Sequence, residues 1–418
     1  MRTRAVRLYG QNDLRLEEFD LAPIRDDELL MRVVSDSLCT STYKAVIQGS
    51  KHKRVPADID VNPIVVGHEM CGEVIQAGAN LRETWQPGAR IVIQPALNLP
   101  GSDYSVGYSF PQLGGSMTYG VIPREIMEQG CVLPYRGSYF RGSMVEPLSC
   151  ILRAFQAMYH IDPNSYERLE GAKDGGKIAI LGGAGPMGLG AIDIALHKEK
   201  PAMVVVTDID AKRLERAARI FSVEDARQKG INLIYVDVSK VSDQVEYLQA
   251  ISGGGFDDIL VMIPNQSILE IADQVAGRDC CINFFAGPTD KEFSVPLNFY
   301  RVHYDSVHVL GTSGGSPEDT IETIKLIEQG VLHPEALITH IGGLDSVIDS
   351  LLSITNSEGL KKICYPDVEM PMTAIADFGQ LGEDNELFRA LDQIVQANNG
   401  LWCDAAEQHL LEHAGTTR

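Results

Sequence analysis

Clustered positive charge, long apolar runs and regularly spaced cysteines are all scarce in this 418-residue sequence. The formal net charge is −21, and because nucleic-acid binding needs clustered Lys and Arg, we expect no nucleic-acid partner. No apolar run approaches the ~20 residues that span a bilayer, and the first residues lack the apolar stretch of a signal peptide. Eight cysteines at irregular spacings do not resemble a disulfide framework. These absences predict a reduced, cytoplasmic protein without membrane segments.

The first part of the chain is rich in predicted strands. Residues 1 to about 150 contain the β-like runs Ala5–Tyr9, Leu29–Val34 and Ala89–Ile93, each bounded by turn residues. Long irregular stretches are expected at 44–63 and 94–118. Loops of that length inside a compact domain are usually functional.

The middle of the chain predicts a doubly wound parallel sheet. From Lys177 onward, apolar strands alternate with helical patterns, which indicates an α/β domain with helices on both faces of its sheet. The predicted strands are Lys177–Leu181, Ala202–Thr207, Leu233–Val236, Asp258–Met262, Cys281–Phe285 and Val307–Leu310.

After this domain the sequence predicts two helices, one short strand and an acidic extension. Helices are predicted near 317–330 and 344–355, followed by a short strand at Lys362–Tyr365. Residues 367–418 carry ten acidic and two basic residues and one amphipathic segment, Leu387–Val395. We expect a helical extension that packs on the body or on a partner, and the sequence assigns it no chemistry.

A glycine-rich turn predicts a dinucleotide site. Gly183-x-Gly185-x-x-Gly188 follows a predicted strand and opens a helix, so that its backbone and the helix N-terminus face a pyrophosphate. Asp208 ends the next strand, 20 residues past Gly188, where a carboxylate binds ribose hydroxyls and repels a 2′-phosphate. NAD(H) is therefore favoured over NADP(H), with Arg213 nearby as the residue that argues against this preference. The expected cofactor contacts are Gly183, Gly185, Pro186, Met187, Gly188, Asp208, Arg213 and Thr312.

Potential metal ligands lie upstream of this turn. His68 and Glu69 stand side by side, and because adjacent strand residues face opposite ways, both can bind one ion only where the backbone turns. Glycines on either side permit such a turn. Cys39 and Glu146 are further candidates, and the wide spacing of the four suits a catalytic ion held by several loops.

The order of these motifs carries a family resemblance. Along the chain the motifs are Cys39-x-Ser41, Gly67-His68-Glu69-x-x-Gly72, Gly114-Gly115, Glu146-Pro147-Leu148 and Gly183-x-Gly185-x-x-Gly188. This order resembles the zinc-containing medium-chain dehydrogenases, which include alcohol, sorbitol and threonine dehydrogenases, and Glu-Pro-Leu resembles the polyol branch. The resemblance implies a GroES-like catalytic domain at 1–151, a Rossmann NAD-binding domain at 152–315 and a returning catalytic part at 316–366. The acidic extension, 367–418, lies outside it.

The resemblance also implies a ligand set. Cys39, His68 and a carboxylate from Glu69 or Glu146 would hold zinc, with the remaining carboxylate reaching it directly or through water. Many relatives carry a second, structural zinc held by four closely spaced cysteines. Here no cysteine lies between Cys71 and Cys131, so we expect one catalytic zinc per chain and no structural zinc.

The proton relay departs from the pattern of the family. Relatives often have aspartate and histidine three and five residues after the cysteine ligand, where this chain has Thr42 and Lys44. Ser41 keeps the hydroxyl that passes the alcohol proton. Lys44 either replaces the missing histidine or faces the substrate.

One dense basic run suggests the substrate. Lys51, Lys53 and Arg54 lie in the loop between Cys39 and His68, and such cations recognise phosphate well. We expect them to bind the phosphate of a sugar or polyol. Together with the segment after Cys39, this run resembles the L-sorbose-1-phosphate reductases.

Other interpretations remain open at this point. The enzyme alternatives are a zinc polyol or secondary-alcohol dehydrogenase that ignores phosphate and a zinc-independent quinone reductase of the same fold. A non-catalytic nucleotide-binding module is the alternative of another class. Relatives commonly pair through the last Rossmann strand, here Val307–Leu310, which predicts a homodimer or homotetramer.

Overall fold

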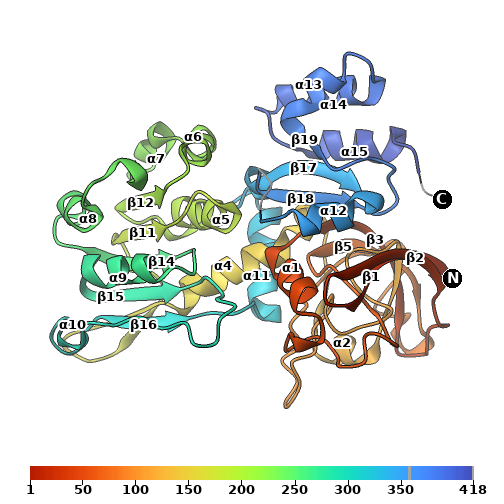
Figure 1. Cartoon of the computed structure of the whole chain (residues 1–418), viewed down its shortest axis with the longest axis horizontal. Helices are drawn as coiled ribbons and strands as arrows, with labels where there is room; N and C mark the ends of the chain where they lie inside the picture. Colours follow the sequence, from red (N-terminus) through yellow and green to blue (C-terminus); the bar gives the residue numbers. More distant parts are fainter. Residues whose placement is uncertain (356–358, 417–418) are drawn as a thin grey trace. The chain divides into compact units, whose positions relative to one another are not determined.

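Two compact units make up the chain. The structure is a computed structural model that describes residues 1–355 and 359–416 (Figure 1). Unit 1 contains residues 1–147, 315–328 and 337–418, and unit 2 contains residues 148–314 and 329–336. Among the described residues, no helix has the length and apolar character needed to cross a bilayer.

Unit 1 is organised around an eight-stranded sheet. Its order is β19-β17-β18-β3-β5-β6-β8, with β7 pairing to β3. These strands are β3 (Leu29–Ser37), β5 (Met70–Ala77), β6 (Arg90–Ile93), β7 (Tyr119–Ile122), β8 (Val132–Pro134), β17 (Ile338–Gly343), β18 (Lys361–Tyr365) and β19 (Thr373–Ala374). Strand β3 pairs with three others, which explains why all but one of its residues are buried. A three-stranded sheet, β2 (Asp13–Asp20), β1 (Arg2–Gly10) and β4 (Ile64–Val65), completes the strand-rich part.

Unit 2 has the predicted doubly wound sheet. Its six strands are parallel and run in the order β13-β12-β11-β14-β15-β16. They are β11 (Lys177–Leu181), β12 (Met203–Asp208), β13 (Asn232–Asp237), β14 (Phe256–Val261), β15 (Ala276–Phe284) and β16 (His308–Gly311). The helices between them include α5 (Pro186–Ile194), α6 (Ala211–Ile220), α8 (Gln244–Ser252), α9 (Gln266–Val275) and α10 (Phe299–Tyr304). The α/β fold class, with a strand-rich unit and a Rossmann unit, is confirmed.

Two elements correct the sequence-based expectation. The stretch 44–63, expected to be irregular, begins inside helix α1 (Thr40–Gln48), whose first turn has no side-chain cap and whose inner face is buried through Thr42, Ala45 and Val46. Strand β17 (Ile338–Gly343) was not expected, because two glycines at its end weaken the β signal. A Cβ on Gly343 would lie 1.9 Å from the Val368 carbonyl oxygen, so a close backbone approach requires glycine there.

The acidic extension folds as part of unit 1. It contains α13 (Phe378–Leu381), α14 (Glu386–Ala397) and α15 (Asp404–His413), drawn in blue in Figure 1. Its apolar side chains form a packed group that includes the fully buried Trp402, Phe378 and Leu391. Packing of this kind, rather than helix propensity, stabilises such short helices.

Candidate active site

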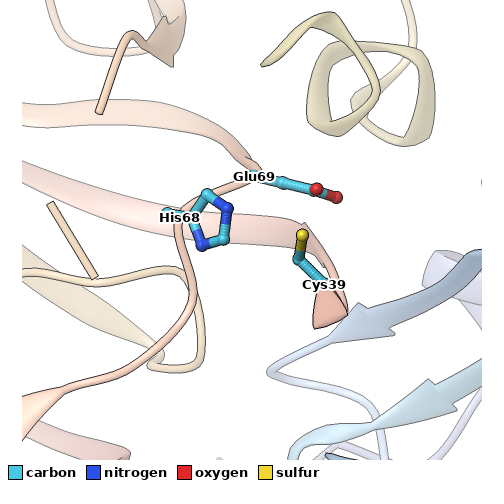
Figure 2. Close-up of side chains that lie close together, drawn as sticks. All are labelled: Cys39, His68 and Glu69. Carbon is cyan, nitrogen blue, oxygen red and sulfur yellow. The ribbon is translucent and has the colours of Figure 1, made fainter. Parts of the chain in front are cut away.

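Three potential metal ligands meet where two paired strands end. Cys39 follows the end of β3, and His68 and Glu69 precede the start of β5 (Figure 2). Their ligand atoms all lie within 4.8 Å of one another. The strands are antiparallel, with Asp36 opposite Met70, and therefore the two segments emerge at the same edge of the sheet.

A glycine makes the turn that lets both His68 and Glu69 face the site. Gly67 has φ +91°, a left-handed conformation that glycine adopts without steric cost. A Cβ at this position would lie 2.2 Å from Asp36 Oδ2 and 2.6 Å from the Ser116 nitrogen. The backbone turn expected from the flanking glycines is present.

The chemistry of the cluster fits a zinc-like cation. Burial raises the pKa of the Cys39 thiol to about 12, with Glu69 adding to the effect, and burial lowers the pKa of His68 to about 4. A bound cation reverses the first of these effects, because it stabilises the thiolate that ligates it. Thr42 Oγ1 lies 3.1 Å from His68 Nδ1, which orients the ring and leaves Nε2 for a metal.

Glu69 also faces a buried cation that the sequence did not reveal. Lys361 Nζ on β18 lies 2.5 Å from both carboxylate oxygens of Glu69, and the two side chains are 4% and 1% exposed. Burial opposes the charged form of Lys361, but Glu69 and Cys39 outweigh it and raise its pKa. A lysine that precedes an apolar strand has no distinguishing local pattern, so nothing in the sequence marked Lys361.

Glu146 approaches the cluster from another element. It lies in the first turn of α4 (Val145–Ala157). Its negative charge contributes to raising the pKa of both Cys39 and Lys361. The group whose donors meet within 4.8 Å contains Glu69 rather than Glu146, so Glu146 stands as a fourth donor within electrostatic reach.

Ser41 contacts the cluster and a tyrosine that sequence reasoning missed. Ser41 Oγ lies 3.0 Å from Cys39 Sγ and 3.3 Å from His68 Nε2. The buried Tyr108 hydroxyl donates a hydrogen bond to Ser41 Oγ at 2.8 Å. The length of the loop 94–118 signalled function, but no pattern within it singled out Tyr108.

The basic loop reaches the site across the Tyr108 ring. The Arg54 guanidinium carbon lies 5.2 Å from the ring centroid, and the His52 ring stacks on it at 5.6 Å. Lys51 and Lys53 are exposed, and Lys53 Nζ lies 4.0 Å from Asp103 Oδ1. Of the predicted phosphate residues, Arg54 is therefore the one that packs against the wall of the site.

Lys44 is half-buried on α1, three residues after Ser41. Burial lowers its pKa, and the charge of a deprotonated Cys39 opposes this shift. The Lys44 ammonium group therefore loses its proton at a lower pH than that of a surface lysine, which makes it a more effective proton donor.

The glycine-rich turn in unit 2 has the geometry of a pyrophosphate site. Gly185 is the residue before α5, and Pro186 opens the helix. A Cβ on Gly188 would lie 2.2 Å from the Gly183 carbonyl oxygen, so the helix packs too closely on the turn for any other residue. A Cβ on Gly185 would meet nothing within 4 Å, which leaves space on the outer side of the turn.

Asp208 lies at the end of β12 beside this turn. Asp208 Oδ2 accepts a hydrogen bond from the Ala184 N–H at 3.0 Å, which holds the carboxylate against the glycine-rich loop. A pocket of about 250 Å³ adjoins it, lined by Asp208 and by apolar residues that include Ile209 and Ile263. Ile209 is 72% exposed, an unusual value for an isoleucine unless an apolar ligand covers it.

The remaining predicted cofactor residues lie on α5, on α6 and directly after β16. Arg213 lies on α6, and its Nε is 3.5 Å from Asp210 Oδ2, with the Arg213 side chain 41% exposed. Met187 is the second residue of α5. The buried Thr312 hydroxyl has no hydrogen-bond partner among residues 1–355 and 359–416, which suits a contact with a bound ligand.

A second group of potential ligands lies in unit 2 but satisfies itself. Asp193 Oδ1 lies 2.8 Å from His197 Nδ1 and 2.9 Å from His333 Nδ1, and Asp193 Oδ2 accepts the His333 backbone N–H at 2.6 Å. Burial opposes the charge of Asp193, but these hydrogen bonds outweigh it and lower its pKa. The group ties α5 to the segment 329–336, and we assign it no metal.

Comparison with known proteins agrees with this arrangement. Residues 25–131 match the alcohol dehydrogenase GroES-like domain, and residues 186–329 match the zinc-binding dehydrogenase domain. A mannitol-1-phosphate 5-dehydrogenase from Aliivibrio fischeri is 47% identical over 413 residues, which cover 98% of this chain and 97% of that protein. An L-sorbose 1-phosphate reductase from Klebsiella pneumoniae is 43% identical over 415 residues, or 99% and 98% of the two chains. The crystal structure of 2R,3R-butanediol dehydrogenase from Bacillus subtilis shares the fold, with a TM-score of 0.71 at 21% identity over 87% of this chain and all of that one.

Metal analysis tests the ligand cluster. We expect the purified protein to hold zinc tightly. His68→Ala should weaken zinc binding by more than about a hundredfold, because losing a residue that is hydrogen-bonded to a ligand already costs about 10–100-fold in affinity, and losing the ligand itself costs more. Cys280→Ser is the matched control, since the Cys280 thiol is buried on β15 of unit 2 and lies outside the cluster. Zinc retention in His68→Ala, or its loss in Cys280→Ser, would contradict this assignment.

Proposed function

Because this chain belongs to the zinc-binding dehydrogenases with an alcohol dehydrogenase GroES-like domain, we propose that it interconverts a polyol phosphate and a ketose phosphate using NAD(H). The two relatives described above, at 47% and 43% identity, are named for reactions of this kind on phosphorylated hexitols and ketoses. The observation that carries the proposal is the placement of the Arg54 guanidinium group against the Tyr108 ring. Arg54 and His52 both contact this ring, whose hydroxyl bonds Ser41 beside the metal ligands.

Arg54 is the central phosphate contact in this proposal. Its guanidinium group lies against Tyr108, close enough that its charge helps to lower the pKa of His68. A planar guanidinium can donate two parallel hydrogen bonds to a phosphate. Lys51 and Lys53, which are exposed, add positive charge at the outer end of the same loop.

The residues of the chain bind and orient the substrate and move its proton. When bound, zinc supplies Lewis acidity toward the substrate oxygen, and the nicotinamide carries the hydride. Cys39, His68 and Glu69 form the ligand set, with Glu146 as the fourth donor. Ser41 passes the proton of the substrate hydroxyl, and Tyr108 fixes the Ser41 side chain through its 2.8 Å hydrogen bond.

Lys44 completes the relay at its outer end. It stands on the same helix as Ser41, where the aligned position in relatives often carries histidine, and its lowered pKa favours proton exchange. The proposal includes one zinc per chain and no structural zinc, since no cysteine lies between Cys71 and Cys131.

A charge change on the basic loop tests the phosphate role. Arg54→Gln should raise KM for a hexitol phosphate by about 10–100-fold, the worth of one charge-assisted contact, and leave KM for the free hexitol nearly unchanged. Lys51→Gln, at the exposed end of the loop, is the control and should change either KM by less than about threefold. Equal effects of Arg54→Gln on the phosphorylated and free substrates would refute the phosphate role and favour a polyol dehydrogenase that ignores phosphate.

Cofactor preference is set by Asp208 in this proposal. Its carboxylate, beside the glycine-rich turn, would hydrogen-bond the ribose hydroxyls of NAD(H) and repel the 2′-phosphate of NADP(H). Asp208→Ser should shift the ratio of kcat/KM for NADH over NADPH toward NADPH by about 10–100-fold, because like-charge contact costs several kcal/mol. Asp225→Ser, which removes an exposed carboxylate from α7 (Val223–Gln228), is the matched control, and a wild-type preference for NADPH would overturn the assignment.

The edge of the unit 2 sheet supports a homodimer or homotetramer. Strand β16 ends the strand order, and Val309 on it is 44% exposed. The adjoining helix α10 exposes Phe299, Tyr300 and Tyr304 by 74%, 67% and 61%. A second copy of the chain pairing along β16 would cover both the unpaired strand edge and these aromatic rings.

Light scattering tests this assembly. The wild-type protein at micromolar concentration should have a mass of at least twice the 45.7 kDa of one chain, and Val309→Asp should dissociate it. Val223→Asp, at a similarly exposed valine on helix α7 (Val223–Gln228) of the same unit, is the control and should leave the mass unchanged. A monomeric wild-type protein would contradict the proposal.

A further inference from the structure

The acidic extension inserts a carboxylate into the interior of unit 1. Glu407, on α15, is only 4% exposed. One of its oxygens accepts hydrogen bonds from the Phe140 N–H at 2.7 Å and the Tyr365 hydroxyl at 2.8 Å, and the other accepts the Tyr139 N–H at 2.8 Å. The Trp402 indole N–H in turn donates to the Tyr365 oxygen at 3.0 Å. The carboxylate thus accepts three hydrogen bonds from two segments of the chain, and Trp402 is joined to it through Tyr365.

The two peptide N–H groups belong to the first turn of α3 (Tyr139–Ser143). An N-terminal helical turn has unsatisfied N–H donors, and a carboxylate is their preferred partner. The residue before α3, Ser138, makes no side-chain cap of its own. Glu407, 268 residues from Tyr139 in sequence, supplies the cap that the local sequence lacks.

The helix that Glu407 caps packs on the two strands that lead to the metal ligands. Ser35 Oγ on β3 donates to the Tyr139 carbonyl oxygen at 2.7 Å. A Cβ on Gly142 would lie 2.3 Å from Cys71 Sγ on β5, so α3 lies directly against that strand. Ser35 precedes Cys39 by four residues and Cys71 follows Glu69 by two, so the strand residues that α3 contacts lead directly to the ligands.

Helix α3 also leads directly into the element that carries Glu146. It ends at Ser143, and after Met144 helix α4 begins at Val145. Glu146 is therefore six residues from the capped N–H of Phe140. Any displacement of α3 relative to β3 and β5 shifts the start of α4 relative to the Cys39 and His68 side chains.

Burying a carboxylate at this position costs desolvation free energy. Burial raises the pKa of Glu407 to about 7, and the nearby Asp404 opposes its charge further, while the hydrogen bonds from Tyr365, Phe140 and Tyr139 favour the charged form. The extension already has an apolar attachment through Trp402, Phe378 and Leu391, all fully buried. If Glu407 served only to attach the extension to the rest of unit 1, an apolar side chain would do so at a smaller cost in desolvation free energy.

We propose that Glu407 is a positioning residue for the metal site, through which the acidic extension fixes α3 and thereby sets the place at which α4 presents Glu146. The carboxylate holds two peptide groups at once, and a peptide group held in this way cannot slide along the strands behind it. The extension is thus a part of the active-site framework. This inference rests on the zinc site of the proposed function.

The rate of zinc loss to a chelator tests the inference in the full-length holoenzyme. Glu407→Ala should speed zinc loss by about tenfold, at the low end of the 10–100-fold cost of losing a group that is bonded to a ligand, because Glu407 acts through α3. Glu407→Gln should give an intermediate rate, because its amide oxygen can still accept from Phe140 and Tyr365 while its NH₂ group cannot accept from Tyr139. Cobalt substitution adds a second readout, since a displaced Glu146 changes the visible absorption of a bound Co²⁺.

Leu391→Ala is the matched control. It opens a cavity in the apolar core of the extension and should lower Tm, yet it leaves the Glu407 hydrogen bonds in place. We expect its zinc-loss rate to stay within about twofold of wild type and its Co²⁺ spectrum to be unchanged. Equal zinc-loss rates in Glu407→Gln and wild type, or in Glu407→Ala and Leu391→Ala, would overturn the positioning role.

The same experiment separates this inference from the proposed zinc site. A wild-type protein that holds no zinc, or a Glu146→Ala variant that loses zinc at the wild-type rate, would contradict the ligand set itself. Zinc held by wild type and lost faster from Glu146→Ala, with no effect of Glu407 substitutions, would leave the zinc site intact and refute only the positioning role.

Discussion

The antiparallel pairing of β3 with β5 is the constraint on which the active site depends. Its register sets Asp36 opposite Met70, and therefore Cys39 and the His68–Glu69 pair leave the sheet at the same edge. A slip of one residue would turn the side chains of one strand to the opposite face. Strand β3 also pairs with β7 and β18, so such a slip would break its register with those strands as well.

Charge balance is the second physical principle of the site. A thiol, an imidazole and the Glu69 carboxylate converge in a buried region, with Glu146 within electrostatic reach, and the Lys361 ammonium group offsets part of the negative charge. The ion pair with Lys361 fixes the position of the Glu69 carboxylate, while burial raises the pKa of the Cys39 thiol, which a bound cation would lower. Metal binding and deprotonation of the cysteine are therefore coupled.

The family comparisons and the local geometry address different questions. Domain matches over 25–131 and 186–329 establish a zinc-binding dehydrogenase, and the fold and metal chemistry follow from that membership. The phosphate side of the proposal depends on local geometry, above all the contact of Arg54 and His52 with Tyr108. The acidic extension lies beyond the two domain matches, and it caps the helix that packs on the strands leading to the ligands.

The sequence alone determined the two-part architecture, the strands of the parallel sheet and the motif residues from Cys39 to Asp208, because strand periodicity and glycine-rich turns are local signals. It missed α1 and β17, whose residues have weak propensities and become ordered through burial against other elements. Only the tertiary structure identified Lys361, Tyr108 and Glu407. Their partners lie 292, 67 and up to 268 residues away along the chain. The choice of partner for a buried polar group is set by which strands and helices are packed together, and no local pattern encodes that choice.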